Sequence, residues 1–258
     1  MGMRFATCAL LVACSSGKPH AVEDAKRPVA AGSDATRDDA APAAVGPSAT
    51  TGDVQVRIEW PEAPATVRAS PGATRCGTPR LPQVAPSTTF GIGDVLVIID
   101  GAPAMVGEVR VRLVDCAWSP RIAIGGSLVL DSAADRPAAV VLSSRLRAGD
   151  LRAKPEEATP LVPVLLPVAG HAVATALDAG VVYQLAADGK DPEVAWIVAA
   201  AGAITDAAGV VLVKDVSVGE HVVRAWLPPR AGLPARHATG KVMVAAGDLA
   251  ELTLALEP

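Results

Sequence analysis

The stretch Asp53-Val54-Gln55-Val56-Arg57-Ile58-Glu59-Trp60 alternates strictly between polar and apolar side chains. Successive side chains of a β-strand point to opposite faces of a sheet, so this alternation predicts a strand with one buried and one solvent-facing side. The same period of two returns in Val109–Leu113 and in Glu251–Leu256. These segments predict three half-buried strands, widely separated along the chain.

Denser apolar runs lie between these segments, separated by Gly, Pro and Asp, and no amphipathic segment of helix length accompanies them. One apolar region, Leu161–Tyr183, is interrupted by Pro163 and Pro167, which predicts successive strands rather than a membrane-spanning helix. About a dozen short strands at this spacing predict an all-β fold, either two sandwich units in tandem or one elaborated sandwich. The dense runs are Val95–Ile99, Ser127–Leu130, Ala139–Leu142, Val194–Val198 and Val210–Val213.

The first 52 residues differ in composition from the rest of the chain. Arg4, the apolar run Phe5–Ala13 and the small residues before Cys14 have the layout of a cleaved secretory signal, which we predict at residues 1–13. Residues 14–52 are mostly Ala, Pro, Ser, Gly and charged residues, and they include no Ile, Leu, Phe, Tyr or Trp. Such a segment buries too little apolar surface to offset the entropy of ordering, so it predicts a disordered tether.

The net charge of the chain and its lack of known catalytic motifs restrict the classes of function that the sequence supports. The chain has 23 basic and 27 acidic residues, a net charge of −4, so nucleic-acid binding is not expected. The sequence has no GxSxG motif, zincin motif or phosphate-binding P-loop, and the spacing of His171, His221 and His237 matches no metal-ligand motif. We therefore expect no enzyme activity and no cofactor, although histidines from different loops could still form a composite metal site.

The tetrapeptide Leu11-Val12-Ala13-Cys14 resembles the lipidation site of bacterial lipoproteins. The resemblance implies that Cys14 becomes the acylated first residue of the mature chain and holds the protein on a membrane through its acyl chains. Ser15 and Ser16 replace the aspartate associated with inner-membrane retention, so the resemblance favours the outer membrane of the cell envelope. The alternatives are an ordinary signal peptide with an incidental cysteine, or a buried first helix.

Two cysteines remain once Cys8 leaves with the signal and Cys14 carries the lipid. An even pair in an oxidising envelope predicts a disulfide between Cys76 and Cys116. The alternative interpretation is two free thiols or two metal ligands, but no histidine lies beside either cysteine in the sequence.

Scattered motifs resemble two families of β-domain. Arg75–Gly77, Gly91–Val97 and Asp115–Arg121 are similar to envelope proteins with a cupredoxin-like, plastocyanin-type sandwich. Ala203–Gly209 and Asp215–Trp226 are similar to the carboxypeptidase regulatory-like segment, a transthyretin-like β unit. The resemblance implies a cupredoxin-like β-sandwich at residues 53–190, followed by a smaller regulatory-like unit at residues 191–258. Asp206–Gly209 supplies turn residues, with Gly209 free to adopt positive φ, so it also predicts a hairpin.

The chain departs from the copper-carrying members of the first family. The turn expected to hold a copper-ligating histidine corresponds to Asp131–Pro137, which contains none. No Cys, His or Met lies between Tyr183 and Trp196, where the resemblance places the remaining ligands. A blue-copper site needs two imidazoles and a thiolate, so we expect no metal at the matching positions.

These observations favour a non-catalytic, lipid-anchored envelope protein with a binding or assembly role. Two alternatives remain. One is a copper-binding or other metal-binding redox protein with an unrecognised ligand set. The other is a carbohydrate- or peptide-binding accessory subunit of an envelope enzyme, because β-sandwiches host many functions.

Overall fold

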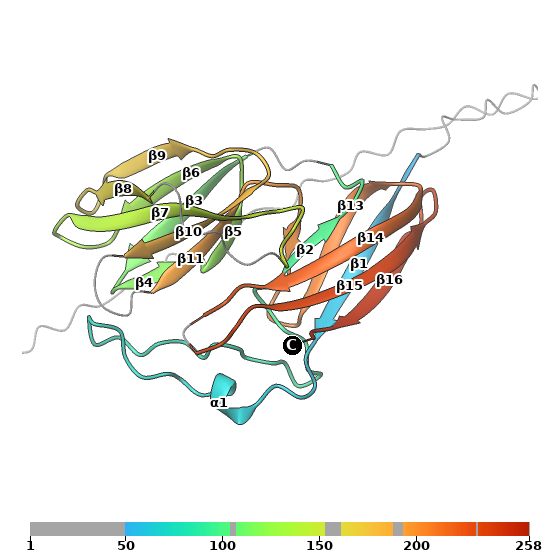
Figure 1. Cartoon of the computed structure of the whole chain (residues 1–258), viewed down its shortest axis with the longest axis horizontal. Coiled ribbons are helices and arrows are strands. Elements are labelled where there is room, and N and C mark those ends of the chain that lie inside the picture. The colour runs from blue at the N-terminus through green and yellow to red at the C-terminus, as the bar shows by residue number, and fades with distance from the viewer. Residues whose placement is uncertain (1–49, 104–106, 153–160, 188–192, 231, 258) are drawn as a thin grey trace, which may run out of the picture. The chain divides into compact units, whose positions relative to one another are not determined.

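The computed structural model describes residues 50–103, 107–152, 161–187, 193–230 and 232–257 (Figure 1). The predicted signal peptide, Cys14 and nearly all of the predicted tether lie outside these residues. The described chain consists largely of β-strands, and its one helix, α1 (Ala65–Arg68), has four residues. The prediction of an all-β fold is confirmed. In the part of the chain that the structure describes, no helix has the length and apolarity needed to cross a membrane.

The strands form four sheets, ordered β13-β1-β16, β12-β2-β14-β15, β4-β3-β6-β9 and β5-β11-β10-β7-β8. Their bounds are β1 Thr51–Glu59, β2 Leu96–Ile99, β3 Glu108–Val114, β4 Ala117–Ser119, β5 Ile122–Ile124, β6 Ser127–Ser132, β7 Ala138–Arg147, β8 Leu161–Leu166, β9 Ala172–Ala176, β10 Val181–Ala187, β11 Val194–Val198, β12 Ala203–Ile204, β13 Val210–Ser217, β14 Gly219–Leu227, β15 Arg236–Val244 and β16 Leu249–Ala255.

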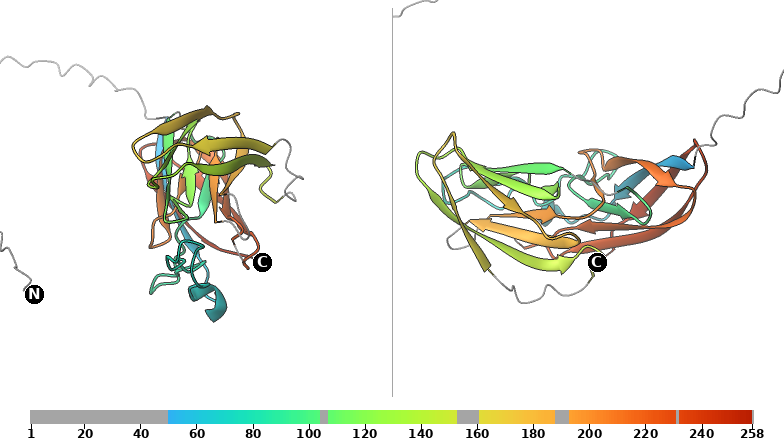
Figure 2. Two further views of the ribbon diagram at one scale, coloured as in Figure 1. Left: turned by 90° about the vertical axis from the view of Figure 1, so that its left-hand side faces the viewer. Right: turned by 90° about the horizontal axis from the view of Figure 1, so that it is seen from above.

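The first two sheets enclose one hydrophobic core, and we call this pair the terminal sandwich. Its central strand β1 has the predicted alternation, because Val54, Val56 and Ile58 are fully buried and their polar neighbours are half-exposed. β1 runs antiparallel to β13 and parallel to β16. Figure 2 shows β1, in blue, among the red strands from the end of the chain.

The other two sheets enclose a second core, and we call this pair the inserted sandwich. β7 and β10 form its longest antiparallel pairing, with Leu142 opposite Leu185. β3 and β6 run parallel, with Val111 opposite Leu130. These four side chains are buried between the two sheets. The predicted division of Leu161–Tyr183 into successive strands is confirmed, because the region forms β8, β9 and the start of β10.

The inserted sandwich, β3 to β11, lies in the chain between β2 and β12. β2 and β12 are hydrogen-bonded neighbours, with Ala203 opposite Val97 and Ile204 opposite Leu96. The sheets group β1 and β2 with the C-terminal strands, and β11 with the middle strands. Period-two patterns identify the buried face of a strand but not its neighbours, so the sequence could not show this insertion.

A third cluster of buried side chains, the junction, joins the two sandwiches. Leu96 and Trp226 come from the outer face of the sheet that contains β2 and β14, and Val198 and Trp196 come from the outer face of the sheet that contains β11. The two indole rings meet edge to face, with their centroids 5.3 Å apart and an interplanar angle of 86°. Each sheet thus buries apolar residues on both of its faces.

The long connection between β1 and β2 carries α1, and we call its residues 60–91 the strap. Val67 and Val84 anchor it in the core of the terminal sandwich, and a hydrogen bond of 3.0 Å joins the Val84 amide to the Val67 carbonyl. A disulfide between Cys76 and Cys116 fastens it to the β3–β4 turn of the inserted sandwich, which confirms the predicted pairing. The strap, teal in Figure 1, is therefore held by both sandwiches.

The turn predicted at Asp206–Gly209 forms, with φ +80° at Gly209. The Asp206 carboxylate accepts hydrogen bonds from the amides of Ala208 and Val210, at 2.9 and 3.0 Å. The strands on either side of the turn do not pair as the predicted hairpin, because β12 enters one sheet of the terminal sandwich and β13 the other. A Cβ at Gly209 would lie 2.4 Å from the Ile92 amide nitrogen, so close backbone packing also requires glycine here.

Candidate anion-binding cavity

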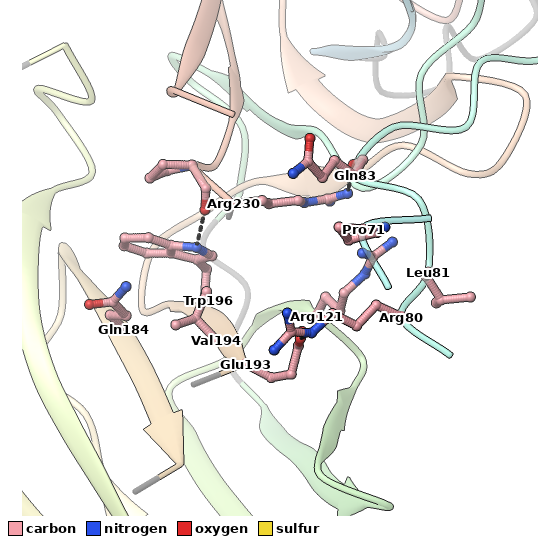
Figure 3. Close-up of a pocket in the computed structure, with 11 residues that line it drawn as sticks. Pro71, Arg80, Leu81, Gln83, Arg121, Gln184, Glu193, Val194, Trp196 and Arg230 are labelled. Atoms are coloured by element: carbon pink, nitrogen blue, oxygen red, sulfur yellow. Dashed lines mark hydrogen bonds and ion pairs between the residues drawn. The ribbon is translucent and has the colours of Figure 1, made fainter. Parts of the chain in front are cut away.

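A cavity of about 370 Å³ opens where the strap and the two sandwiches meet (Figure 3). The strap supplies Arg80 and Gln83, the inserted sandwich supplies Arg121, and Arg230 follows β14 of the terminal sandwich. Trp196 of β11 lies at the edge of the same space. Three arginines that are far apart in the sequence are thereby brought to one place.

Arg230 is the most buried of these arginines, with 10% of its side chain exposed. Its guanidinium donates to the Gln83 carbonyl of the strap and lies 3.2 Å from a carboxylate oxygen of Asp94. Its pKa is lowered to about 10, first because burial disfavours the charged form and then because the Arg121 charge is close, while Asp94 partly offsets both effects. Arg230 therefore keeps its positive charge at neutral pH.

Asp94 links two of the arginines. The same carboxylate oxygen, Oδ2, lies 3.2 Å from Arg230 and 3.6 Å from Arg121. Thr205 positions this acid: its hydroxyl donates to the Ile92 carbonyl at 2.7 Å and accepts from the Val95 amide at 3.1 Å. Thr205 is almost fully buried, so the backbone on both sides of Asp94 is held by a protected side chain.

Arg80 forms an ion pair of 2.5 Å with Glu193, which fastens the strap to the inserted sandwich. Arg121 also contacts the strap, because its guanidinium donates to the Pro82 carbonyl at 3.3 and 3.4 Å. The carboxylates of Asp94 and Glu193 form ion pairs with these three guanidinium groups, which all line the same cavity. The cluster is suited to a ligand with negative charge.

The guanidinium group matches carboxylate and phosphate geometry, because its N–H donors form a planar fork. Within the cavity, Gln83 and Gln184 add side-chain amides, and Trp196 adds an apolar edge. The indole nitrogen of Trp196 donates to the Pro229 carbonyl at 3.1 Å, which fixes the ring in place. A concave site with apolar walls and a few converging polar groups is the usual form of a small-ligand site in proteins.

The structure keeps the three histidines of the sequence analysis apart. His171 borders an exposed hollow with Arg110 and Asp131, and the imidazole Nε2 of His221 lies 2.6 Å from the Ser217 carbonyl oxygen. Burial, and then the Arg152 charge, lower the pKa of His237. Among the described residues, no group of three or more His, Cys, Asp or Glu side chains is placed to hold a metal ion.

The arginines of the cavity were missed by the sequence analysis, although Asp94 and Arg121 lie within motifs quoted there. Single arginines in loops resemble ordinary solvated charges, and their convergence depends on the insertion. One sequence signal was present: the chain contains three Pro-Arg dipeptides, and their arginines are Arg80, Arg121 and Arg230. Proline fixes φ of its own residue and restricts the residue before it, so each arginine follows a backbone segment with reduced freedom.

Comparisons of the chain with protein-family models, with curated proteins and with solved structures found no match.

Proposed function

We propose that this chain is a non-catalytic, lipid-anchored envelope protein that binds an anionic ligand in the cavity between its two sandwiches. The observation that carries the proposal is the arginine cluster, in which the guanidinium groups of Arg80, Arg121 and Arg230 line one cavity. Keeping a buried arginine charged costs free energy, and burial lowers the pKa of Arg230 for this reason. Binding of an anion would offset that cost.

The proposal includes the placement expected from the lipoprotein resemblance. Cys14 carries the acyl chains, residues 14–52 form the tether, and the outer membrane is the expected site of attachment. The cupredoxin-like and regulatory-like identities of the β-domains are part of the same proposal, supported by the motifs quoted above and by the all-β architecture. In this arrangement the two sandwiches project from the membrane and present the cavity to the surrounding compartment.

Anion binding can be tested on the full chain purified in detergent, with succinate, phosphate and sulfate as probes at constant ionic strength. A ligand that binds only the folded state raises the unfolding midpoint, and about 1 kcal/mol of stabilisation corresponds to roughly 2–4 °C for a domain of this size. We expect at least one of these anions to raise the midpoint of the wild-type protein, and Arg121→Gln to abolish that rise.

Arg152→Gln is the matched control, because this arginine is 60% exposed and does not line the cavity. The control variant should respond to the anion as the wild type does. An equal response of Arg121→Gln and the wild type, or no response of the wild type to any of the three anions, would contradict the proposed function.

Membrane attachment is tested separately by Cys14→Ser in the native host. The acyl-anchor model expects this variant in the soluble fraction after cell lysis, while the wild type sediments with membranes. Retention of the variant in the membrane fraction would show that the anchor lies elsewhere.

A further inference from the structure

An apolar strip extends from the cavity across the outer face of the sheet β5-β11-β10-β7-β8. Four residues of the strip are cross-strand neighbours: Val194 on β11 is opposite Ala186 on β10, Ala186 is opposite Val141 on β7, and Val141 is opposite Pro163 on β8. They point away from the core, because Leu142, Leu185 and Val164 on the same strands point into it. All four members of the strip are half-exposed or exposed. We call Val141, Pro163, Ala186 and Val194 the open strip.

The open strip is continuous with two features already described. Val194 also lines the arginine cavity. On the same outer face, Trp196, Val182 and Val198 are buried in the junction. One part of this sheet face is therefore covered by the terminal sandwich, and the open strip presents apolar side chains beside the arginine-lined cavity. Leu165 extends the apolar surface beyond the strip and is 67% exposed.

We propose that the cavity receives the C-terminal carboxylate of a partner polypeptide, and that the apolar residues before this carboxylate lie along the open strip. The inference rests on the proposed function and names its ligand class. The carboxylate fits the planar N–H donors of Arg80, Arg121 and Arg230, which line the cavity. Gln83 and Gln184, which line the cavity, carry both a donor and an acceptor, as pairing with main-chain amides requires.

The dimensions suit a short extended segment. Crossing from β11 to β8 takes three inter-strand steps of about 4.8 Å, or roughly 14 Å in total, which about four extended residues span. An acyl chain fits the site less well, because an open strip leaves one side of the chain in water and fatty-acid sites are enclosed. A peptide places alternate side chains on the strip and leaves the others in solvent.

The probe is an octapeptide of alternating Ser and Leu that ends in Leu, in two forms, with a free and with an amidated C-terminus. Its affinity for the full chain in detergent is measured by fluorescence anisotropy of an N-terminally labelled peptide, and unlabelled octanoate serves as competitor. We expect the free acid to bind at least tenfold more tightly than the amide. Arg121→Gln should remove this difference.

Two variants test the strip. Val141→Lys places a charge at the centre of the open strip. Leu165→Lys places a charge at the exposed margin of the strip, where a substitution is least harmful to folding. We expect Val141→Lys to weaken peptide binding at least tenfold and Leu165→Lys to weaken it less. Leu212→Lys is the matched control on an exposed position of β13, outside the strip, and should bind the peptide as the wild type does.

The outcomes separate this inference from the proposed function. If the small-anion response depends on Arg121 but the free acid binds no more tightly than the amide, the cavity binds anions and the peptide proposal is wrong. Unchanged peptide affinity in both strip variants would also overturn it. Octanoate that displaces the peptide at concentrations below the peptide's own Kd would assign the strip to an acyl chain instead. If Arg121→Gln changes neither the anion response nor the peptide affinity, both proposals fail.

Discussion

Trp196 and Trp226 are both buried in the junction, but their indole nitrogens are in different situations. The Trp196 nitrogen donates to the Pro229 carbonyl at 3.1 Å. The Trp226 nitrogen is buried and has no hydrogen-bond partner among the described residues. A buried donor without a partner has lost its hydration without compensation, so it makes a smaller net contribution to stability than a paired one.

We therefore expect Trp196→Phe to lower the free energy of unfolding more than Trp226→Phe, by about 1 kcal/mol, the typical net value of one hydrogen bond. Both replacements remove a similar volume from the same cluster, so the loss of packing is matched. Urea denaturation of the two variants measures the difference. Equal losses, or a larger loss for Trp226→Phe, would show that the Trp226 nitrogen has an acceptor in solution.

The lowered pKa of His237 predicts that the stability of the fold depends on pH. Burial, followed by the charge of Arg152, lowers its pKa below the ordinary value of 6.5, which the unfolded chain retains. On acidification through this range the unfolded chain takes up the proton first, so the folded state loses stability as the pH falls below about 6.5. We expect His237→Gln to lose less stability than the wild type between pH 7.5 and pH 5.5 in urea denaturation.

His171→Gln is the control for this measurement, because His171 is an exposed residue at the turn before β9. It should retain the acid sensitivity of the wild type. If His237→Gln and the wild type lose the same stability between the two pH values, protonation of another group accounts for the acid sensitivity.

At the scale of elements, the strap depends on the disulfide. The Cys76–Cys116 bond closes a loop with a sequence separation of 40 residues. The chain-entropy estimate for such a loop is about 4 kcal/mol of stabilisation. We expect Cys76→Ser/Cys116→Ser to lower the free energy of unfolding by about this amount in urea denaturation, because the cross-link no longer restricts the unfolded chain.

The same variant should weaken binding at the cavity, since the strap supplies Arg80 and the Gln83 carbonyl that Arg230 contacts. Reduction of the wild-type protein with dithiothreitol should reproduce both effects, and the double variant should be insensitive to the reductant. A double variant as stable as the oxidised wild type would show that the ion pairs and Val67–Val84 packing hold the strap without the covalent link.

Individual elements could be predicted from the sequence because their signals are local. Alternation placed Val54, Val56 and Ile58 on one buried face, and the turn at Asp206–Gly209 follows from an Asp side chain that bonds nearby amides and a glycine at positive φ. Pairing is not local. Nothing in the pattern of β1 indicates that its neighbour β16 lies about two hundred residues along the chain.

The candidate site was hidden for the same reason. Arg121 of the inserted sandwich meets Asp94 and Arg230, which flank strands of the terminal sandwich, only because one sandwich is inserted into the other, and each alone looks like a solvated loop charge. The cysteine pair could be predicted because an even count in an oxidising compartment restricts the pairing, whereas arginines carry no such constraint. The Pro-Arg dipeptides mark restricted backbone but do not reveal convergence.

At the scale of the whole molecule, the insertion gives each core its own tryptophan reporter. Trp60 is buried in the terminal sandwich, Trp118 in the inserted sandwich, and Trp196 and Trp226 in the junction. The chain has no other tryptophan. Labelling with 5-fluorotryptophan therefore follows both cores and the junction in one sample by fluorine NMR, once single Trp→Phe variants have assigned the four resonances.

We expect the native resonances of Trp60 and Trp118 to disappear with one urea midpoint, because unfolding either sandwich would expose the apolar outer face that the other covers.

Trp226→Ala leaves a cavity in the junction and should cost about 3–5 kcal/mol of stability. In that variant the midpoints of Trp60 and Trp118 should separate, because the loss falls on the contact between the sandwiches rather than on either core. Separate midpoints in the wild type, or a single shared midpoint in Trp226→Ala, would mean that the junction does not couple the two cores. In the latter case, coupling would have to run through the strap, and reduction of Cys76–Cys116 in the Trp226→Ala background should then separate the two midpoints.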